Sequence, residues 1–208
     1  MTKSLAFKSD KKFLRRVYSL KLSKMSLYQR RQKTKKINEM MLNLPLWKKA
    51  NLIAVYHAFK QEPSLSAFYS VWKNKICFPK IENKKLVFYT NKENLWEENK
   101  FSILEPVSKS KSKVSLKDIS TFLIPGLAFD REGGRLGRGL AYYDKTLSSL
   151  QKKFNANDFL NQVLFIGVAF TEQINPITLP LSSQDVLMNC LVTDEFVLWP
   201  VNLKKGGT

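Results

Sequence analysis

The sequence predicts an α/β fold in which helices cover both faces of a sheet. Short apolar runs typical of buried strands, such as Leu52–Tyr56, alternate along the chain with longer segments of helical spacing. Alternation of this kind is typical of a sheet packed against helices on each side. The 208 residues and the 44% hydrophobic content suffice for one well-packed core. We therefore expect a single domain over residues 1–208.

Capping patterns predict two helices near the start of the chain. Asp10 can cap a helix that begins at Lys11. Ser26 and Gln29 form a capping-box pattern for a second helix, which Pro45 ends. Residues 1–10 are expected to be a disordered lead-in to the first helix.

The remaining expected elements are strands and one further helix. Strands are expected at the short apolar runs 52–56, 76–78, 86–89, 122–124, 163–170 and 191–192. A helix-like stretch runs from residue 65 to 72. The Ser/Lys segment 108–113 has low complexity and is expected to be a mobile surface loop.

The composition narrows the class of protein. No stretch of about 18 unbroken apolar residues occurs, so no membrane span is expected. Cys77 and Cys190 are far apart and lie in no CxxC pair, which argues against a disulfide framework or a zinc site and suits the cytoplasm. His57 is the only histidine, so sites built from several histidines are excluded.

The formal net charge of +18 is the strongest compositional anomaly. Much of it lies in residues 1–36, where Asp10 is the only acidic residue. Such a field attracts polyanions, whether nucleic acid, an anionic membrane or anionic metabolites. Solvated helix faces would produce the same composition. The charge alone does not choose among these interpretations.

A glycine-rich basic loop from Pro125 to Asp144 is the most informative segment, because it lies between an expected strand and a helix-like stretch. Its glycines let backbone N–H groups approach an anion, and the helix that follows adds the positive end of its dipole. Arg135 and Arg138 match phosphate or carboxylate oxygens, while Asp130 and Asp144 can hold a hydrated Mg²⁺. The combination indicates a nucleotide and metal site, although an irregular connection with solvated arginines would look similar. The segment is neither a Walker A loop nor a GxGxxG motif.

This loop resembles the signature of the 5-formyltetrahydrofolate cyclo-ligase (methenyltetrahydrofolate synthetase) family. Order and spacing of the family's motifs hold from Lys11 to Glu195. The similar stretches are Lys11–Arg15, Tyr56–Glu62, Leu104–Pro106, Pro125–Asp130, Arg135–Asp144 and Gly167–Phe170 with Gln173. The resemblance implies a three-layer α/β/α sandwich with a mixed, mainly parallel central sheet. Its cleft should lie beyond the carboxyl ends of the strands.

The family's reaction is the ATP- and Mg²⁺-dependent closure of 5-formyltetrahydrofolate to 5,10-methenyltetrahydrofolate, with release of ADP and phosphate. The resemblance implies that the γ-phosphoryl group is transferred to the formyl oxygen and that N10 attacks the activated carbon. The implied partners are ATP and 5-formyltetrahydrofolate, with or without a polyglutamate tail. The oligomeric state is not indicated.

The resemblance also implies roles for individual residues. The expected catalytic residues are Arg138 and Tyr142. The expected ATP-binding residues are Lys11, Lys12, Arg15, Arg135, Gly137, Arg138, Gly139 and Tyr143. Those expected to bind the folate are His57, Glu62, Arg138 and Tyr142, and those expected to bind the metal are Asp144 and Asn189. Taken singly, each has an ordinary structural explanation as a helix-face charge, a cap or a packed side chain.

Two positions depart from the family pattern. Ala141 replaces the third glycine of the loop, and its methyl group can hinder close approach or disfavour positive φ. Asn189 falls where a second metal-binding Asp is expected and brings no charge, while Asp185 or a shifted register offers an alternative.

Three hypotheses follow. An active cyclo-ligase is favoured over a folate- or nucleotide-binding relative that has lost turnover. A basic, nucleic-acid-associated protein on the same scaffold is the third, and it would bind RNA or DNA in a strongly salt-dependent way.

Overall fold

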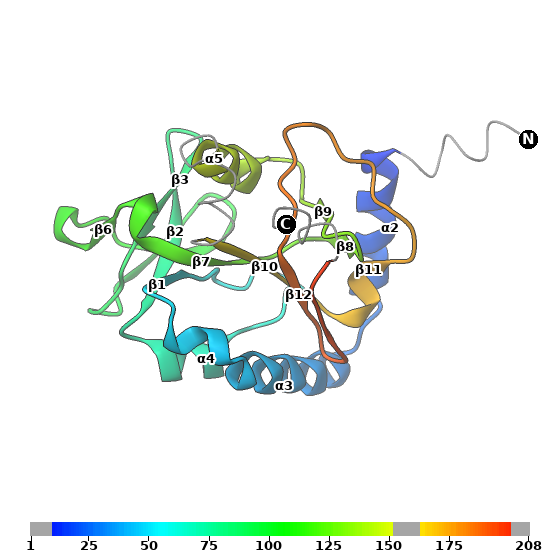
Figure 1. The fold of residues 1–208 in the computed structure, drawn as a ribbon, viewed down its shortest axis with the longest axis horizontal. Helices are drawn as coiled ribbons and strands as arrows, with labels where there is room; N and C mark the ends of the chain where they lie inside the picture. Colours follow the sequence, from blue (N-terminus) through cyan, green and yellow to red (C-terminus); the bar gives the residue numbers. More distant parts are fainter. Residues whose placement is uncertain (1–9, 152–162, 201–208) are drawn as a thin grey trace, which may run out of the picture.

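The computed structural model describes residues 10–151 and 163–200, so the lead-in expected over residues 1–10 lies outside them except for Asp10. Its main feature is an eight-stranded sheet with the strand order β13-β12-β10-β7-β1-β2-β3-β6 (Figure 1). The five strands from β12 to β2 run parallel to one another, while β13, β3 and β6 pair antiparallel. The expected mixed, mainly parallel sheet is therefore confirmed.

The strands of this sheet are short. Their bounds are β1 (Leu52–Ala54), β2 (Ile76–Glu82), β3 (Lys85–Tyr89), β6 (Lys113–Val114), β7 (Ile119–Ile124), β10 (Leu164–Val168), β12 (Cys190–Val192) and β13 (Val197–Leu198). Every strand expected from the apolar runs is present, within a few residues at its ends. The segment expected to be a mobile loop contains a 3₁₀ turn (Ser110–Ser112) and the first residue of β6. Its mobility stays a prediction.

Helices lie on both sides of the sheet. Figure 1 shows α3 (Leu27–Asn43) and α4 (Ser66–Trp72) along one face, with α5 (Tyr142–Gln151) on the other. α2 (Lys11–Ser23) stands beside a small sheet of β8 (Ala128–Asp130), β9 (Arg135–Leu136) and β11 (Ile174–Asn175). A two-stranded ribbon, β4 (Trp96–Glu98) and β5 (Leu104–Pro106), and 3₁₀ turns at Pro45–Lys48, Leu116–Asp118 and Thr171–Gln173 complete the elements.

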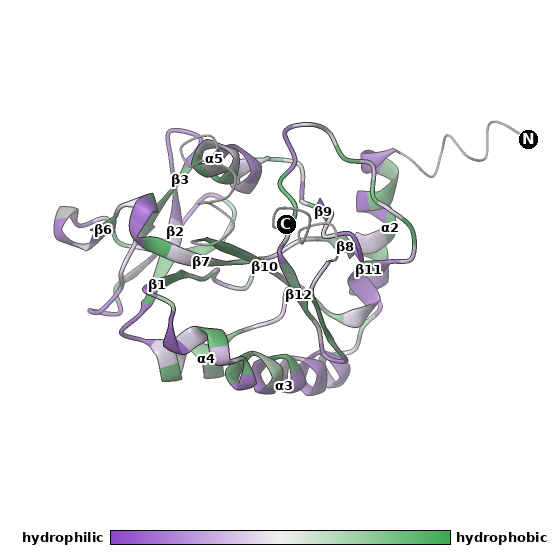
Figure 2. Cartoon of the chain, viewed as in Figure 1, coloured by the Kyte–Doolittle hydropathy of each residue, from purple (hydrophilic) through white to green (hydrophobic). Residues whose placement is uncertain are grey.

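Alternating side chains build two separate cores, which confirms the three-layer arrangement. Ile53 and Leu123 pack in the cluster that contains the buried residues of α3 and α4. Their neighbours Ala54 and Phe122 belong to the cluster that contains Leu147 of α5. This is the period of two that a strand requires when both of its faces are covered. Figure 2 shows the same pattern, with hydrophobic strands inside and hydrophilic outer helix surfaces.

The expected helix caps are confirmed. The side chain of Asp10 accepts a hydrogen bond from the backbone N–H of Lys12 at 2.7 Å. Ser26 and Gln29 exchange both bonds of a capping box, and α3 ends two residues before Pro45. No helix among residues 10–151 and 163–200 combines the length and the apolar character needed to cross a membrane.

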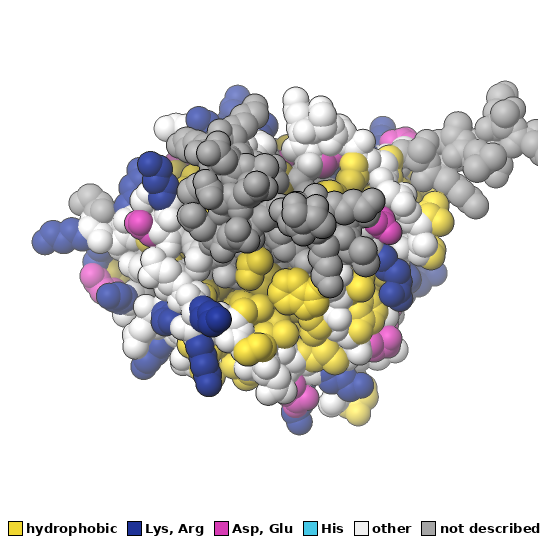
Figure 3. Space-filling model, viewed as in Figure 1, with side chains coloured by type: hydrophobic (Ala, Val, Ile, Leu, Met, Phe, Trp, Pro, Cys, Tyr) yellow, Lys and Arg dark blue, Asp and Glu magenta, His cyan; other side chains and the backbone are white. Residues whose placement is uncertain are grey.

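A buried ion pair ties α3 to the end of the sheet. The ammonium of Lys33 contacts Asp194 at 2.5 Å and Glu172 at 3.0 Å. Burial alone would raise the pKa of Asp194, but hydrogen bonds from Lys33 and from the backbone N–H of Thr171 outweigh it and leave the pKa below its usual value. Figure 3 shows other Lys and Arg side chains spread around the rim of one molecular face, as expected of solvated charges.

Candidate functional site

A cleft of about 1450 Å³ opens beyond the carboxyl ends of the parallel strands. Its walls include the loop that follows β1, the glycine-rich loop that follows β7, the first turns of α2 and α5, and residues 182–185. These segments come from distant parts of the sequence. The cleft therefore lies where open α/β sheets generally bind ligands.

Asp130 shapes the glycine-rich loop from within. Its Oδ1 accepts hydrogen bonds from the backbone N–H groups of Glu132 (2.9 Å) and Gly134 (2.8 Å). Its Oδ2 accepts one from Leu179 at 2.7 Å, and the residue is only 1% exposed. Asp130 does not line the cleft and is buried, so a metal ion bound in the cleft would not reach its carboxylate. The sequence-based suggestion that Asp130 could hold Mg²⁺ is therefore not supported, because the residue acts as a loop clamp.

Gln173 fixes the start of the same loop. Its side-chain amide donates hydrogen bonds to the carbonyls of Gly126 (2.7 Å) and Leu127 (3.3 Å), while its oxygen accepts one from Phe170 N–H. The side chain is fully buried. Buried polar contacts of this kind hold the loop in a single geometry at the end of β7.

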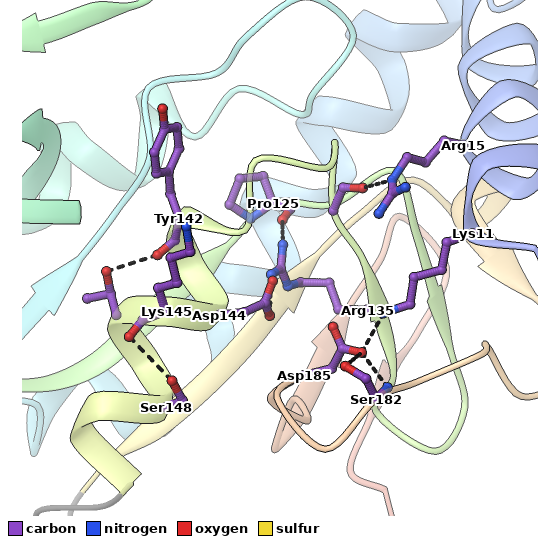
Figure 4. Close-up of polar contacts among 12 residues, drawn as sticks. Lys11, Arg15, Pro125, Arg135, Tyr142, Asp144, Lys145, Ser148, Ser182 and Asp185 are labelled. Atoms are coloured by element: carbon purple, nitrogen blue, oxygen red, sulfur yellow. Dashed lines mark hydrogen bonds and ion pairs between the residues drawn. The ribbon is translucent and has the colours of Figure 1, made fainter. Parts of the chain in front are cut away.

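Arg135 and Asp144 form a buried ion pair at the base of the cleft. The guanidinium donates to Asp144 at 2.8 Å and to the carbonyl of Pro125 at 3.3 Å (Figure 4). It also lies 5.6 Å from the ring centre of Tyr143, which suits a cation–π contact. Burial raises the pKa of the Tyr143 hydroxyl, so it remains a neutral phenol at physiological pH.

Glu62 and Arg138 form a second pair. Arg138 Nε donates to Glu62 Oε1 at 3.2 Å, and Glu62 Oε2 accepts the backbone N–H of Phe59 at 3.0 Å. The Glu62 side chain is only 8% exposed. Burial raises the pKa of this carboxyl, although Arg138 and the Phe59 N–H partly oppose the shift.

The first turns of α2 contribute Lys11 and Arg15 to the cleft. They lie four residues apart on one helix face, as the sequence predicts. Arg15 Nε donates to the carbonyl of Gly137 at 2.9 Å, and Lys11 contacts Asp185 at 2.5 Å (Figure 4). Asp185 also accepts hydrogen bonds from the N–H and hydroxyl of Ser182. Burial alone would raise the Asp185 pKa, but these bonds outweigh it and lower the pKa.

His57 and Tyr142, which were expected to bind the folate, also line the cleft. The His57 ring meets Trp96 edge-on, with centres 5.3 Å apart. Burial lowers the pKa of His57, an effect that a hydrogen bond with the Ala58 backbone opposes in part. The loop leaves this part of the cleft through two left-handed residues, Gly139 with φ of +106° and Ala141 with φ of +53°.

Two predicted site residues lie elsewhere. Lys12 is exposed and does not line the cleft. Asn189 is also outside it, because its amide oxygen accepts the backbone N–H of Phe165 at 2.7 Å and anchors the start of β12 against β10. Neither residue is therefore placed to contact a ligand in the cleft. All the other predicted site residues line the cleft.

Among the described residues, four carboxylates line the cleft and could coordinate Mg²⁺. They are Glu62, Glu105, Asp144 and Asp185. In the described part of the chain, no three His, Cys, Asp or Glu side chains gather as a closed metal cage. Mg²⁺ commonly uses one or two carboxylates and completes its shell with phosphate oxygens and water. Asp144 and Asp185 line the cleft, each paired with a cation, and as two carboxylates they fit that requirement. From the sequence, Asp185 was only an alternative; the spacing of Ser182 and Asp185, which are joined by hydrogen bonds in a turn, is a signal that could have favoured it.

The fold and the cleft together define an open α/β protein with several Lys and Arg side chains in a cleft at the carboxyl ends of its strands. The sequence model of the 5-formyltetrahydrofolate cyclo-ligase family matches residues 7–194, and the chain belongs to this family. A probable 5-formyltetrahydrofolate cyclo-ligase of Schizosaccharomyces pombe is 36% identical over 107 residues, which cover 48% of this chain and 50% of that protein. The chain thus spans about half the length of this relative.

Other relatives are matched over more of their length. The 5-formyltetrahydrofolate cyclo-ligase of Mycoplasma genitalium is 28% identical over 169 residues, covering 79% of this chain and 87% of that protein. The solved structure of Aquifex aeolicus 5,10-methenyltetrahydrofolate synthetase superposes with a TM-score of 0.76 and 28% identity, covering 95% of each chain.

Proposed function

We propose that the protein is a 5-formyltetrahydrofolate cyclo-ligase, which uses ATP to close 5-formyltetrahydrofolate to 5,10-methenyltetrahydrofolate and releases ADP and phosphate. The names of its relatives support this activity. The observation that carries the proposal is the meeting of Lys11 and Arg15 from α2 with Arg135 and Arg138 from the glycine-rich loop in one cleft. These four cations come from two segments that are more than a hundred residues apart in the sequence. Their position in one cleft suits a polyphosphate ligand.

The nucleotide is assigned to this basic wall. Lys11, Arg15, Arg135 and Arg138 would contact its phosphates, with Gly137 and Gly139 allowing close backbone approach and Tyr143 holding Arg135 in place. Asp144 and Asp185 would hold Mg²⁺, which supplies positive charge to the transferring phosphoryl group. The ion pairs Lys11–Asp185 and Arg135–Asp144 fix these side chains before a ligand arrives, and such preorganisation favours catalysis by positioning.

The folate is assigned to the opposite wall. Glu62 is the acceptor that would anchor N–H donors of the pterin ring, and His57 and Tyr142 line the same part of the cleft. Arg138 reaches both walls, because it pairs with Glu62 from within the glycine-rich loop. We therefore assign to Arg138, with Tyr142 beside it, the stabilisation of charge at the reacting formyl group.

The chemistry follows from the poor leaving ability of the formyl oxygen. Transfer of the γ-phosphoryl group to this oxygen breaks the bond to ADP and converts the oxygen into part of a phosphate. N10 then attacks the formyl carbon and loses its proton, and the carbon–oxygen bond breaks to release phosphate, which can carry that proton away. The protein has to bind and align the substrates and neutralise their charge, and no covalent intermediate with the protein is needed.

The two free, buried cysteines are in keeping with a cytoplasmic location.

The proposal is tested by mixing the purified protein with 5-formyltetrahydrofolate, ATP and Mg²⁺ and following the near-ultraviolet absorbance of the methenyl product. Product should form only when ATP is present, with one ADP released per turnover. Lys11→Gln and Lys12→Gln make a matched pair, because the two lysines are adjacent but only Lys11 lines the cleft. Lys11→Gln should lower kcat/KM at least tenfold, a loss of about 1.4 kcal/mol of transition-state stabilisation, whereas Lys12→Gln should change it little.

Each outcome separates the hypotheses. Ligand binding without product in folded protein would identify a binding relative that has lost turnover. Equal losses in the two lysine variants would refute the placement of the phosphates. Tight RNA binding that survives physiological salt, with no folate or ATP binding, would favour the nucleic-acid alternative.

A further inference from the structure

In the cleft, both carboxylate oxygens of Glu62 accept hydrogen bonds from the chain itself. Oε1 accepts from Arg138 Nε at 3.2 Å, and Oε2 accepts from the Phe59 N–H at 3.0 Å. With 8% of the side chain exposed, water does little to replace either partner. Because this buried side chain leaves little open space around Oε1, a ligand that donates an N–H group to that oxygen would compete with Arg138.

Arg138 is held toward the folate wall by a second contact. Its guanidinium lies 5.3 Å from the ring centre of Phe59, which belongs to the same loop as Glu62. The Arg138 side chain is 30% exposed, so it has room to move within the cleft. Its neighbours in the glycine-rich loop are the residues assigned to the phosphates.

We propose that Glu62 is a positioning residue for Arg138, holding the guanidinium at the folate wall until the folate takes the carboxylate and frees Arg138 for the phosphates. This inference rests on the proposed function. Its consequence is positive coupling, in which each substrate raises the affinity of the cleft for the other.

The sign of the coupling follows from the cost of breaking the pair. If the nucleotide bound alone and drew Arg138 away, the buried Glu62 carboxylate would lose its counter-ion. Donors from a bound pterin would satisfy that carboxylate and remove the cost. The raised pKa of Glu62 agrees with this reasoning, because it shows that burial already disfavours the charge even with Arg138 in place. Thermodynamic linkage requires the same factor in both binding orders.

Binding of a non-hydrolysable ATP analogue with Mg²⁺, measured calorimetrically, tests the inference without turnover. Glu62→Gln keeps the shape of the side chain but releases Arg138, so it should bind the analogue about fivefold or more tightly than the wild type when folate is absent. A purely structural role would leave affinity unchanged or weaken it. Glu105→Gln is the matched control, because Glu105 is another buried, cleft-lining carboxylate but has no recorded cation partner among the described residues.

Two further measurements complete the design. In wild-type protein, saturating 5-formyltetrahydrofolate should tighten analogue binding by about fivefold or more, and Arg138→Gln should abolish this effect. In the Arg138→Gln background, Glu62→Gln should no longer tighten binding. The wild-type measurement keeps the inference testable even if the Glu62 variant does not fold.

The inference is overturned if Glu62→Gln binds the analogue no more tightly than the wild type, if Glu105→Gln shows the same gain, or if the gain persists without Arg138. It is also overturned if folate leaves the wild-type affinity unchanged. A folded wild-type protein that binds no analogue at all would instead refute the proposed function.

Discussion

Replacing Ala141 by glycine should stabilise the protein. Ala141 adopts φ of +53°, in the left-handed region where the Cβ atom of an L-residue crowds the backbone. The residue immediately precedes α5, and its carbonyl accepts the backbone N–H of Lys145. The conformation is therefore fixed by the helix that follows, and the alanine has no freedom to relax.

The expected gain is a difference between two effects. Left-handed geometry costs a non-glycine residue about 1–2 kcal/mol. Glycine also makes the unfolded chain more flexible, and this lowers the free energy of unfolding by about 0.4–1 kcal/mol. The net stabilisation should be about 0–1.6 kcal/mol, with a midpoint of about 0.8 kcal/mol, and for a chain of this size that midpoint corresponds to a rise in Tm of about 2–3 °C.

Urea and thermal unfolding of the wild type and Ala141→Gly measure this gain directly. Ala67→Gly is the control, because Ala67 is exposed within α4 and has ordinary helical geometry. In the control variant, the free energy of unfolding should fall by about 0.5–1 kcal/mol. If both variants lose stability by similar amounts, Ala141 is not strained and the reasoning fails.

Three further variants test the framework around the cleft. Asp130→Ala leaves three backbone donors, two of them buried, without their acceptor, and urea unfolding should show a loss of about 2 kcal/mol or more. Gly167→Ala places a Cβ 2.6 Å from the Phe129 ring and 2.7 Å from Leu191, so unfolding should show a loss of about 1–3 kcal/mol; an unchanged midpoint would contradict the packing. Asp194 has a lowered pKa in the folded state, so its stabilisation is present above the unfolded pKa of about 3.9 and is lost as the pH falls through the lower folded value. The stability difference between wild type and Asp194→Asn should therefore be large at pH 7 and small near pH 2, and a constant difference would refute the ion-pair origin.

The buried elements could be predicted because their signals are local. The run at 122–124 has the apolar character of a strand covered on both faces, and the Ser26 capping box fixes a helix start within four residues. The short strands β8, β9 and β11 gave no such signal. A strand of two or three residues is too short to show an alternating hydrophobic pattern. In addition, β11 pairs with β8, which lies more than forty residues earlier in the sequence.

The cleft was predicted well where side chains follow a regular period. Lys11 and Arg15 share a helix face, and both reach the cleft. Lys12 lies about 100° further around the same helix, so it is directed away from that face and into solvent. Helical geometry alone would have removed Lys12 from the set of ligand contacts.

The proposed metal ligand Asp185 was hard to predict because it lies in a segment without regular secondary structure. Residues 181–189 form no helix or strand, so neither period tells which side chain faces the cleft. The structure resolves the choice through local bonds: Ser182 and Lys11 direct Asp185 into the cleft, whereas Asn189 bonds to the Phe165 N–H beside β10. An aspartate at 189 could accept that same bond, and because residue 189 does not line the cleft, its lack of charge is not part of the metal site that we propose. The argument for lost turnover then depends on Ala141 alone, and Ala141 already adopts the left-handed geometry that the loop requires at a modest cost in stability.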